Sequence, residues 1–127
     1  AMTVENGGIA TRDFIYVDDI VTGLIRCAEA GAAGEVYNLA SGEETSILDL
    51  ANLINELTGN PTVLDFRPKR SWDHSGKRFG SPEKSTRELD FRVQTSLREG
   101  LGETIAWTRE HLPLIKACMA RHAAHMA

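Results

Sequence analysis

The sequence alternates short apolar segments, rich in β-branched and aromatic residues, with longer segments whose apolar residues recur at helical spacing. The helical pattern is clearest in residues 46–59, where Ser46 and Asp49 have the spacing of a capping box and Gly59 supplies a stop signal. Strands that alternate with helices in this way predict an α/β fold. With 127 residues, the chain is long enough to bury one hydrophobic core.

The same signals predict the remaining elements. Extended segments are expected at residues 13–17, 36–40 and 63–66. Further helices are expected at residues 18–31, at residues 82–89 and from Ser96, where Glu99 completes a second capping box. The sequence after Leu112 is rich in alanine, and we expect residues 113–127 to form a weakly helical tail.

In the helix expected at residues 18–31, Asp18 is positioned as the N-terminal cap and Gly31 as a left-handed stop. The apolar stripe of this helix consists of Ile20, Val21, Leu24, Ile25 and Ala28. Gly23 costs about 1 kcal/mol relative to alanine inside a helix, which indicates the close approach of another backbone.

Composition excludes several classes of protein. Apolar residues make up 42% and charged residues 25%, so a disordered or fibrous chain is not expected. No apolar run approaches the roughly 20 residues that span a bilayer, and the first residues lack the pattern of a signal peptide. We therefore expect a cytoplasmic protein without a membrane segment. Cys27 and Cys118 have neither metal-binding nor disulfide spacing, and we expect them to be reduced thiols.

Charge is unevenly distributed along the chain. The net charge is −4, which opposes general affinity for nucleic acid. Residues 67–78, called the basic loop below, nevertheless contain five basic residues and the single acid Asp73. A basic loop in an acidic protein indicates a discrete anion site, although the same pattern is typical of a solvated loop.

The sequence contains none of the common cofactor or catalytic motifs. There is no glycine-rich dinucleotide loop after a strand, no P-loop and no nucleophile elbow. Neither Tyr16 nor Tyr37 is followed by a lysine four residues later, so no tyrosine–lysine acid/base pair and no catalytic residue is assigned. His122 and His125 could share a helical face, but they have no neighbouring third ligand, and we expect no metal site.

Two arginines are the leading candidates for binding an anion. Arg12 lies between a glycine-rich turn and an apolar segment, and Arg70 lies in the basic loop. Two guanidinium groups on separate loops suit a diphosphate, because each donates paired hydrogen bonds and stays charged at any working pH. Alternatively, Arg12 forms a salt bridge with Asp13 or Asp18, and Arg70 is exposed to solvent.

Three further residues in or beside the basic loop are candidates for binding a nucleotide. Asp73 could accept hydrogen bonds from sugar hydroxyls, or it could pair with Lys69 or Lys77. Trp72 and Phe79 could stack on a base or pack beneath the loop. The residues alone leave both alternatives open for each of the three.

Four blocks of sequence carry a resemblance to a known family. In chain order they read RDFIYVDDIVTGL, EVYNLASGEETSILDLANLI, FRPKRSWDHSGKRFGSPEKSTRELDF and SLREGLGETIAWT. They resemble the C-terminal half of an extended short-chain dehydrogenase/reductase, of the NAD-dependent nucleotide-sugar epimerase and dehydratase family that includes UDP-glucose 4-epimerase. The resemblance implies that Arg12 and Arg70 contact the nucleotide diphosphate and that Asp73 reaches the ribose hydroxyls. Trp72 replaces a glycine that is usual in this block.

The resemblance also implies that separate parts of the intact enzyme bind the substrate and NAD. Residues 1–127 would form a small substrate-binding domain or a fragment, and the Rossmann domain that binds NAD would be absent from this chain. The intact enzyme would remove a hydride from a UDP- or dTDP-sugar to give a keto-sugar, and we expect a homodimer. This chain alone would be inactive and would expose apolar surface, which favours dimerisation, swapping or a loosened N-terminal region.

Two alternatives remain open at this point. The chain could be a free-standing anion-binding or protein-interaction module without catalysis. It could also belong to a reductase or decarboxylase of the same fold, because the C-terminal half does not determine what happens to the keto-sugar.

Overall fold

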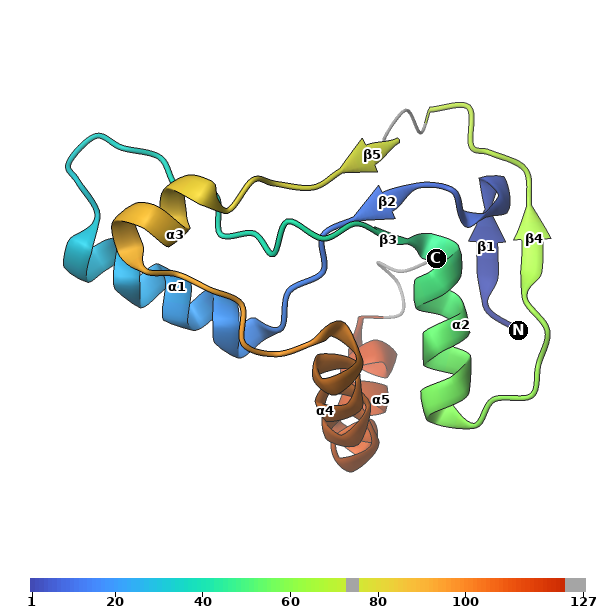
Figure 1. The fold of residues 1–127 in the computed structure, drawn as a ribbon. Coiled ribbons are helices and arrows are strands. Elements are labelled where there is room, and N and C mark those ends of the chain that lie inside the picture. Colours follow the sequence, from blue (N-terminus) through green and yellow to red (C-terminus); the bar gives the residue numbers. More distant parts are fainter. Residues whose placement is uncertain (73–75, 123–127) are drawn as a thin grey trace.

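The computed structural model describes residues 1–72 and 76–122, in which short strands and helices confirm the predicted α/β fold (Figure 1). The helices are α1 (Val17–Ala30), α2 (Ile47–Thr58), α3 (Glu83–Leu89), α4 (Leu97–Glu110) and α5 (Leu112–Arg121). The strands are β1 (Thr3–Glu5), β2 (Thr11–Arg12), β3 (Thr45–Ser46), β4 (Asp65–Arg67) and β5 (Lys77–Arg78), and a 3₁₀ turn, η1, covers Asn6–Gly8. None of the described helices is long and apolar enough to cross a membrane.

The strands form small sheets that place distant parts of the chain side by side. β1 pairs in parallel with β4, with Glu5 opposite Arg67. In the other sheet β2 lies between β3 and β5, antiparallel to β3 and parallel to β5, with Arg12 opposite Arg78. The segment 3–12 is thereby held against both ends of the basic loop.

The caps of α2 and α4 form as predicted. The Ser46 hydroxyl accepts a hydrogen bond from the backbone N–H of Asp49 (3.0 Å), and Gly59 ends α2 in the left-handed region at φ 67°. At α4 the capping box is complete, because the Glu99 carboxylate also accepts from the backbone N–H of Ser96 (3.0 Å). Hydrogen bonds from the Ser96 side chain and backbone lower the pKa of Glu99.

The two ends of the molecule have different architectures. Figure 1 shows α1 and α3 side by side at one end, which we call the α1–α3 end, and α2 beside β1 and β4 at the other, the sheet end. α2 also contacts α4, where the Arg98 guanidinium donates two hydrogen bonds to the Glu56 carboxylate (2.9 and 3.0 Å). The hydrogen bond from Arg98 and its charge lower the pKa of Glu56.

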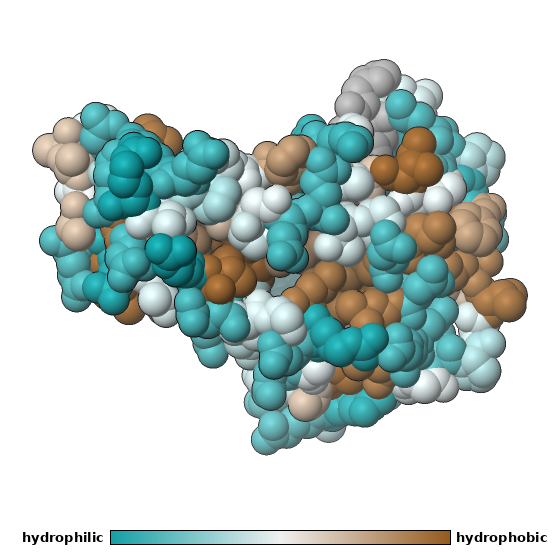
Figure 2. All heavy atoms as spheres, in the orientation of Figure 1, coloured by the Kyte–Doolittle hydropathy of each residue, from teal (hydrophilic) through white to brown (hydrophobic). Residues whose placement is uncertain are grey.

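Few side chains are fully buried. Among the described residues, the buried apolar side chains are those of Val4, Ala40, Ala51, Leu89 and Phe91. The chain exposes 9009 Å², whereas a compact protein of 13.9 kDa exposes about 6,700 Å². Apolar side chains are visible at the surface across the middle of the face in Figure 2. The predicted exposure of apolar surface is therefore observed.

The start and the end of α1 differ from the prediction. Val17 is the first helical residue and Tyr16 the capping position, so the strand predicted at residues 13–17 is wrong and Asp18 lies in the first turn. Strand pairing stops at Arg12, and the next residue, Asp13, accepts hydrogen bonds from Ser41 and Gly42 through its side chain. Gly31 ends the helix with extended backbone at φ −66°, so the predicted left-handed stop is also wrong.

The buried face of α1 is not its most apolar face. Asp19 and Gly23 are buried, whereas Val17, Val21, Leu24 and Ile25 are 47–59% exposed. A Cβ atom at Gly23 would lie 2.8 Å from atoms of both Leu39 and Phe91. The close approach predicted at Gly23 is thus confirmed, but side chains rather than a backbone make it.

Residues 36–40 do not form the predicted strand. The segment is held instead by side chains of α3. Lys84 Nζ donates to the carbonyl oxygen of Val36 (3.0 Å), and the buried hydroxyl of Ser85 donates to that of Asn38 (2.7 Å). These donors satisfy carbonyl groups that a neighbouring strand would otherwise bind. The strand predicted at residues 63–66 is present, but as β4 it begins two residues later.

Candidate functional site

Strand pairing gathers basic side chains around one pocket at the sheet end. The pocket lies between β1, β2 and the two ends of the basic loop, and its volume is about 580 Å³. Among the described residues, its lining includes four basic side chains, Arg12, Lys69, Arg70 and Lys77, and one acidic side chain, Glu5. This basic pocket therefore carries a net positive charge, which suits an anion.

A backbone carbonyl holds Arg12 at the pocket. Its Nη1 donates to the carbonyl oxygen of Gly76 (3.0 Å) in the basic loop. The neighbouring Asp13 accepts hydrogen bonds from the backbone N–H and the hydroxyl of Ser41 (3.0 and 2.6 Å) and from the N–H of Gly42 (3.0 Å). Two consecutive residues at the end of β2 are thus anchored in different ways. The Gly76 carbonyl holds the guanidinium group of Arg12, and the Asp13 carboxylate holds the turn after Ala40.

Arg70 reaches from the basic loop to β1. Its Nε donates to the Glu5 carboxylate, and its guanidinium carbon lies 5.2 Å from the centre of the Trp72 ring. The Arg70 side chain is 54% exposed, so the group is accessible to solvent and also held by an ion pair. The Trp72 side chain is largely exposed and contacts Arg70.

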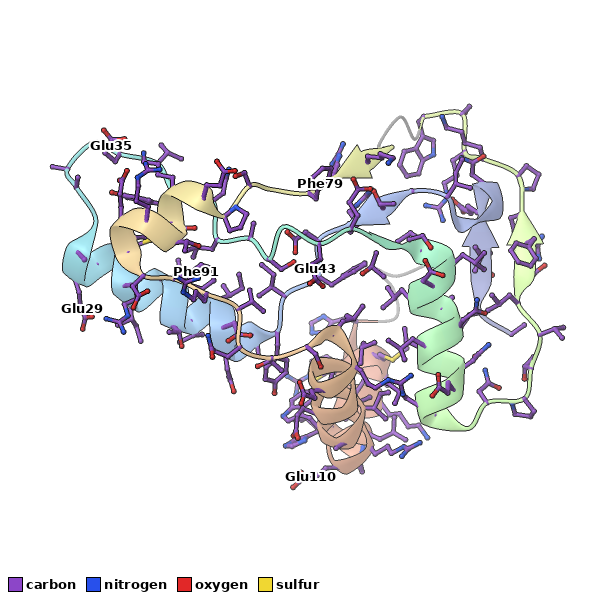
Figure 3. The ribbon with its side chains drawn as sticks, in the orientation of Figure 1. Glu29, Glu35, Glu43, Phe79, Phe91 and Glu110 are labelled. Atoms are coloured by element: carbon purple, nitrogen blue, oxygen red, sulfur yellow. The ribbon has the colours of Figure 1, made fainter. Side chains whose placement is uncertain are left out.

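Phe79 lies away from the basic pocket. It follows β5 on the side toward α3, where it lines a separate hollow with Asn38, Ala40 and Gly80 (Figure 3). The predicted site residue Asp73 lies outside the described residues. The structure therefore brings Arg12 and Arg70 together, places Trp72 against Arg70, and leaves Phe79 elsewhere.

Among the charged residues that line the basic pocket, the sequence does not identify Glu5, Lys69 and Lys77 as site residues. The two lysines belong to the basic loop, so the local concentration of positive charge could have identified them. Lys77 also forms an ion pair with Glu44 (3.4 Å). Glu5 has no local signal, because its contact with Arg70 joins positions 65 residues apart.

The other cavities are less suited to an anion. A cavity of about 550 Å³ beside the start of α4 has Arg92 and Glu43 among its lining residues, so these opposite charges offset each other. An apolar cavity of about 320 Å³ lies between α2 and α4, next to Tyr16. Desolvation, with the nearby carboxylates of Asp18 and Glu103, raises the pKa of Tyr16 and keeps its phenol protonated.

The N-termini of α1, α2 and α4 do not fit the pyrophosphate of a dinucleotide. Its pyrophosphate is usually bound where a glycine-rich turn leads into the N-terminus of a helix. Here the first turn of α1 carries Asp18 and Asp19, and α2 and α4 begin with Asp49 and Glu99 in their first turns. Carboxylates at these positions repel phosphate, so these three helix N-termini are unsuited to NAD. His125 lies outside the described residues, which contain no metal-binding group of three His, Cys, Asp or Glu residues.

Solved structures share the fold of this chain. The Bordetella bronchiseptica enzyme WbmF, solved in complex with NAD+ and UDP, matches with a TM-score of 0.85 and 55% identity, over 98% of this chain and 36% of that chain. UDP-glucose 4-epimerase from Thermotoga maritima, solved with UDP-glucose, matches with a TM-score of 0.82 and 31% identity, over 87% of this chain and 35% of that chain. The fold is therefore that of part of an extended short-chain dehydrogenase/reductase.

Sequence similarity identifies the family within this class. The model of the NAD dependent epimerase/dehydratase family matches residues 1–40. UDP-glucuronic acid decarboxylase 1 of Arabidopsis thaliana is 32% identical over 111 residues, which are 87% of this chain and 25% of the relative. The chain is therefore similar, over most of its length, to part of enzymes of the NAD dependent epimerase/dehydratase family. It spans about a quarter to a third of the length of curated relatives that it matches.

Proposed function

We propose that this chain binds the diphosphate of a nucleotide sugar in the basic pocket, as the substrate-binding part of an NAD-dependent sugar epimerase or dehydratase. The observation that carries the proposal is that Arg12 and Arg70, from distant loops, line one pocket together with Lys69 and Lys77. Guanidinium groups donate paired hydrogen bonds to phosphate oxygens, and ammonium groups add positive charge. Similarity to enzymes of this family supports this role over a free-standing interaction module.

The ligand in this proposal is a nucleotide sugar, either a UDP-sugar or a dTDP-sugar. Similar structures were solved with UDP and with UDP-glucose, which supports UDP as the first ligand to test. Relatives named for dTDP-sugar chemistry, such as dTDP-glucose 4,6-dehydratase of Actinoplanes, make dTDP the natural comparison. Trp72 is exposed beside Arg70, where it can stack on a base.

The chemistry on the sugar belongs, in this proposal, to residues outside this chain. The carboxylates at the starts of α1, α2 and α4 do not suit NAD, and relatives about two and a half to three and a half times as long share this part of their length. NAD supplies hydride transfer in such enzymes. The residues of the basic pocket hold the diphosphate, which keeps the sugar close to the NAD while the orientation of the sugar changes.

The exposed face of α1 supports a covering partner for this chain. Val17, Val21, Leu24 and Ile25 recur at helical spacing and remain about half exposed. In the intact enzyme, we propose that a dinucleotide-binding domain packs on this face. Purified alone, the chain is expected to form a homodimer through it, and Leu24→Glu is expected to shift sedimentation toward the monomer.

Calorimetric titration of the purified chain with UDP, dTDP and their glucose conjugates tests the proposal. Arg12→Ala and Arg70→Ala are each expected to weaken binding of UDP by about 1.5 to 3 kcal/mol, the range for hydrogen bonds to charged groups. The loss should be similar for UDP and UDP-glucose, because both arginines are assigned to the diphosphate.

Arg98→Ala is the matched control. Arg98 is also an exposed arginine in an ion pair, but it binds Glu56 between α4 and α2. We expect UDP affinity to be unchanged in this variant. Equal affinity in wild type, Arg70→Ala and Arg98→Ala would refute the assignment of the basic pocket to the diphosphate.

A further inference from the structure

An acidic side chain lies within the basic pocket. Glu5 is the last residue of β1, its side chain is 26% exposed, and its carboxylate accepts a hydrogen bond from Nε of Arg70. Among the described residues that line the pocket, Glu5 is the one acid. Since a carboxylate reduces the attraction of the pocket for an anion, its presence there requires a physical reason.

The geometry of the contact supplies that reason. Glu5 belongs to a paired strand, with Arg67 of β4 opposite it, so its backbone is fixed. Arg70 lies three residues beyond β4 in the basic loop, and its long side chain has many rotamers when it is unrestrained. The ion pair with Glu5 ties this side chain to the sheet, and the Trp72 ring restricts it further.

Glu5 binds Arg70 through Nε and not through the two Nη groups. A guanidinium group has five N–H donors arranged in a planar fork, so a carboxylate at Nε is compatible with a phosphate on the edge formed by both Nη groups. Glu5 and the diphosphate can therefore use different edges of the same guanidinium group.

We infer that Glu5 is a positioning residue, which orients Arg70 so that its Nη edge is available to the diphosphate before the ligand arrives. This inference rests on the proposed function, and it adds a residue that acts through Arg70 and does not touch the ligand. Preorganisation of this kind improves affinity because less side-chain freedom is lost on binding. The competing possibility, that Glu5 occupies Arg70 in place of a ligand, predicts the opposite effect of removing the carboxylate.

The first test needs no ligand. In ¹⁵N NMR spectra, the Nε–Hε signal of Arg70, assigned by its loss in Arg70→Lys, should exchange slowly with water in the wild type. Glu5→Ala should abolish the slow exchange, and Glu5→Gln should keep it because the amide oxygen still accepts the hydrogen bond. Glu35→Ala, which removes an exposed partner of Lys84 far from the pocket, should leave the signal unchanged. Fast exchange in the wild type would overturn the inference.

The second test is a double-mutant cycle read as UDP affinity. Glu5→Ala should weaken UDP binding about 5- to 20-fold when Arg70 is present, and by less than about twofold in Arg70→Ala. Glu5→Gln should stay within about threefold of the wild type. Tighter binding in Glu5→Ala, or the same change in both backgrounds, would overturn the positioning role.

The two proposals fail in different ways. If Arg70→Ala leaves UDP affinity unchanged, the diphosphate site is wrong and the role of Glu5 in binding is refuted with it. If Arg70→Ala weakens UDP binding and Glu5→Ala does not, the diphosphate site stands and the inference about Glu5 alone is refuted.

Discussion

The α1–α3 end and the sheet end depend on different interactions. At the α1–α3 end, Phe91 and Ser85 are fully buried, and Gly23 lets Leu39 and Phe91 approach the helix closely. At the sheet end, the side chains of the basic pocket are charged, partly exposed and held by ion pairs and backbone carbonyls. Tight packing stabilises the first region, whereas the second region, apart from the buried Val4 of β1, keeps charged groups accessible to a ligand.

This comparison predicts that mutations at the two ends separate stability from binding. Substitutions among the packed residues of the α1–α3 end should lower the free energy of unfolding. Substitutions in the basic pocket should lower affinity for a nucleoside diphosphate while the free energy of unfolding changes little, because exposed ion pairs contribute about 0 to 1 kcal/mol.

The largest expected effect is at Phe91. Phe91→Ala should lower the free energy of unfolding by about 3 to 5 kcal/mol, since the side chain is buried and its removal leaves a cavity. Urea denaturation followed by circular dichroism measures the change. Phe66→Ala at the sheet end is the control, because Phe66 is 56% exposed, and it should cost about 0.5 kcal/mol. Equal losses in the two variants would remove the contrast between the ends.

Two glycines inside helices give the next test. Gly23→Ala should destabilise the chain by about 1 to 2 kcal/mol, because the new Cβ would lie 2.8 Å from Leu39 and Phe91. Gly102→Ala in α4 should stabilise it by up to about 1 kcal/mol, because the Cβ there meets open space and alanine favours the helix. The urea midpoints of the two variants should therefore move in opposite directions. A shift in the same direction would show that α1 is less tightly packed than described.

A smaller effect is expected from the lysines of the basic pocket. Lys69→Ala should weaken UDP binding about two- to fivefold, because an exposed ammonium group contributes about 0.4 to 1 kcal/mol. Calorimetry at low and at physiological salt should show a smaller difference between Lys69→Ala and wild type at the higher salt concentration. Lys116→Ala in α5 is the control, and it should bind UDP like the wild type. A loss that does not depend on salt would mean that Lys69 acts by shaping the loop.

The smallest expected effect is on how the stability of the chain depends on pH. Hydrogen bonds from Arg98 and Ser96 lower the pKa values of Glu56 and Glu99 in the folded chain. Below the ordinary glutamate pKa of about 4.3, the unfolded chain takes up protons that the folded chain does not, so stability should fall as the pH is lowered through that range. Urea midpoints measured between about pH 5 and pH 3 should decline less steeply in the Glu56→Gln/Glu99→Gln variant. An unchanged slope would contradict the assigned hydrogen bonds.

The elements that local chemistry dictates could be predicted from the sequence. The Ser46 cap of α2, the capping box of α4 and the stop at Gly59 follow from residues within a few positions of each other. The segment 36–40 could not be predicted, because its conformation depends on side chains of α3 that lie almost 50 residues away. The same reason applies to α1, whose buried face is chosen by Leu39 and Phe91 and not by its own apolar stripe.

The residues of the candidate site, like the helices and strands, could be predicted only where a local signal identifies them. Residue type and charge identify Arg12 and Arg70 as candidates, because few other side chains suit a diphosphate. Their presence in one pocket depends on the pairing of β1 with β4 and of β2 with β5, which joins positions more than 60 residues apart. Glu5 could not be identified for the same reason. Phe79 shares the aromatic character of Trp72 but lies beyond β5, on the side toward α3.

Titration of the ¹⁵N-labelled chain with UDP, followed by two-dimensional NMR, tests directly whether the diphosphate binds in the basic pocket. If the diphosphate binds in the basic pocket, backbone amide signals there, including those of Glu5, Arg12 and Gly76, should shift, while signals of α1 and α3 stay in place. Shifts centred instead on the cavity at the start of α4, around Thr95 and Ser96, or the absence of any shift at saturating UDP, would contradict binding in the basic pocket.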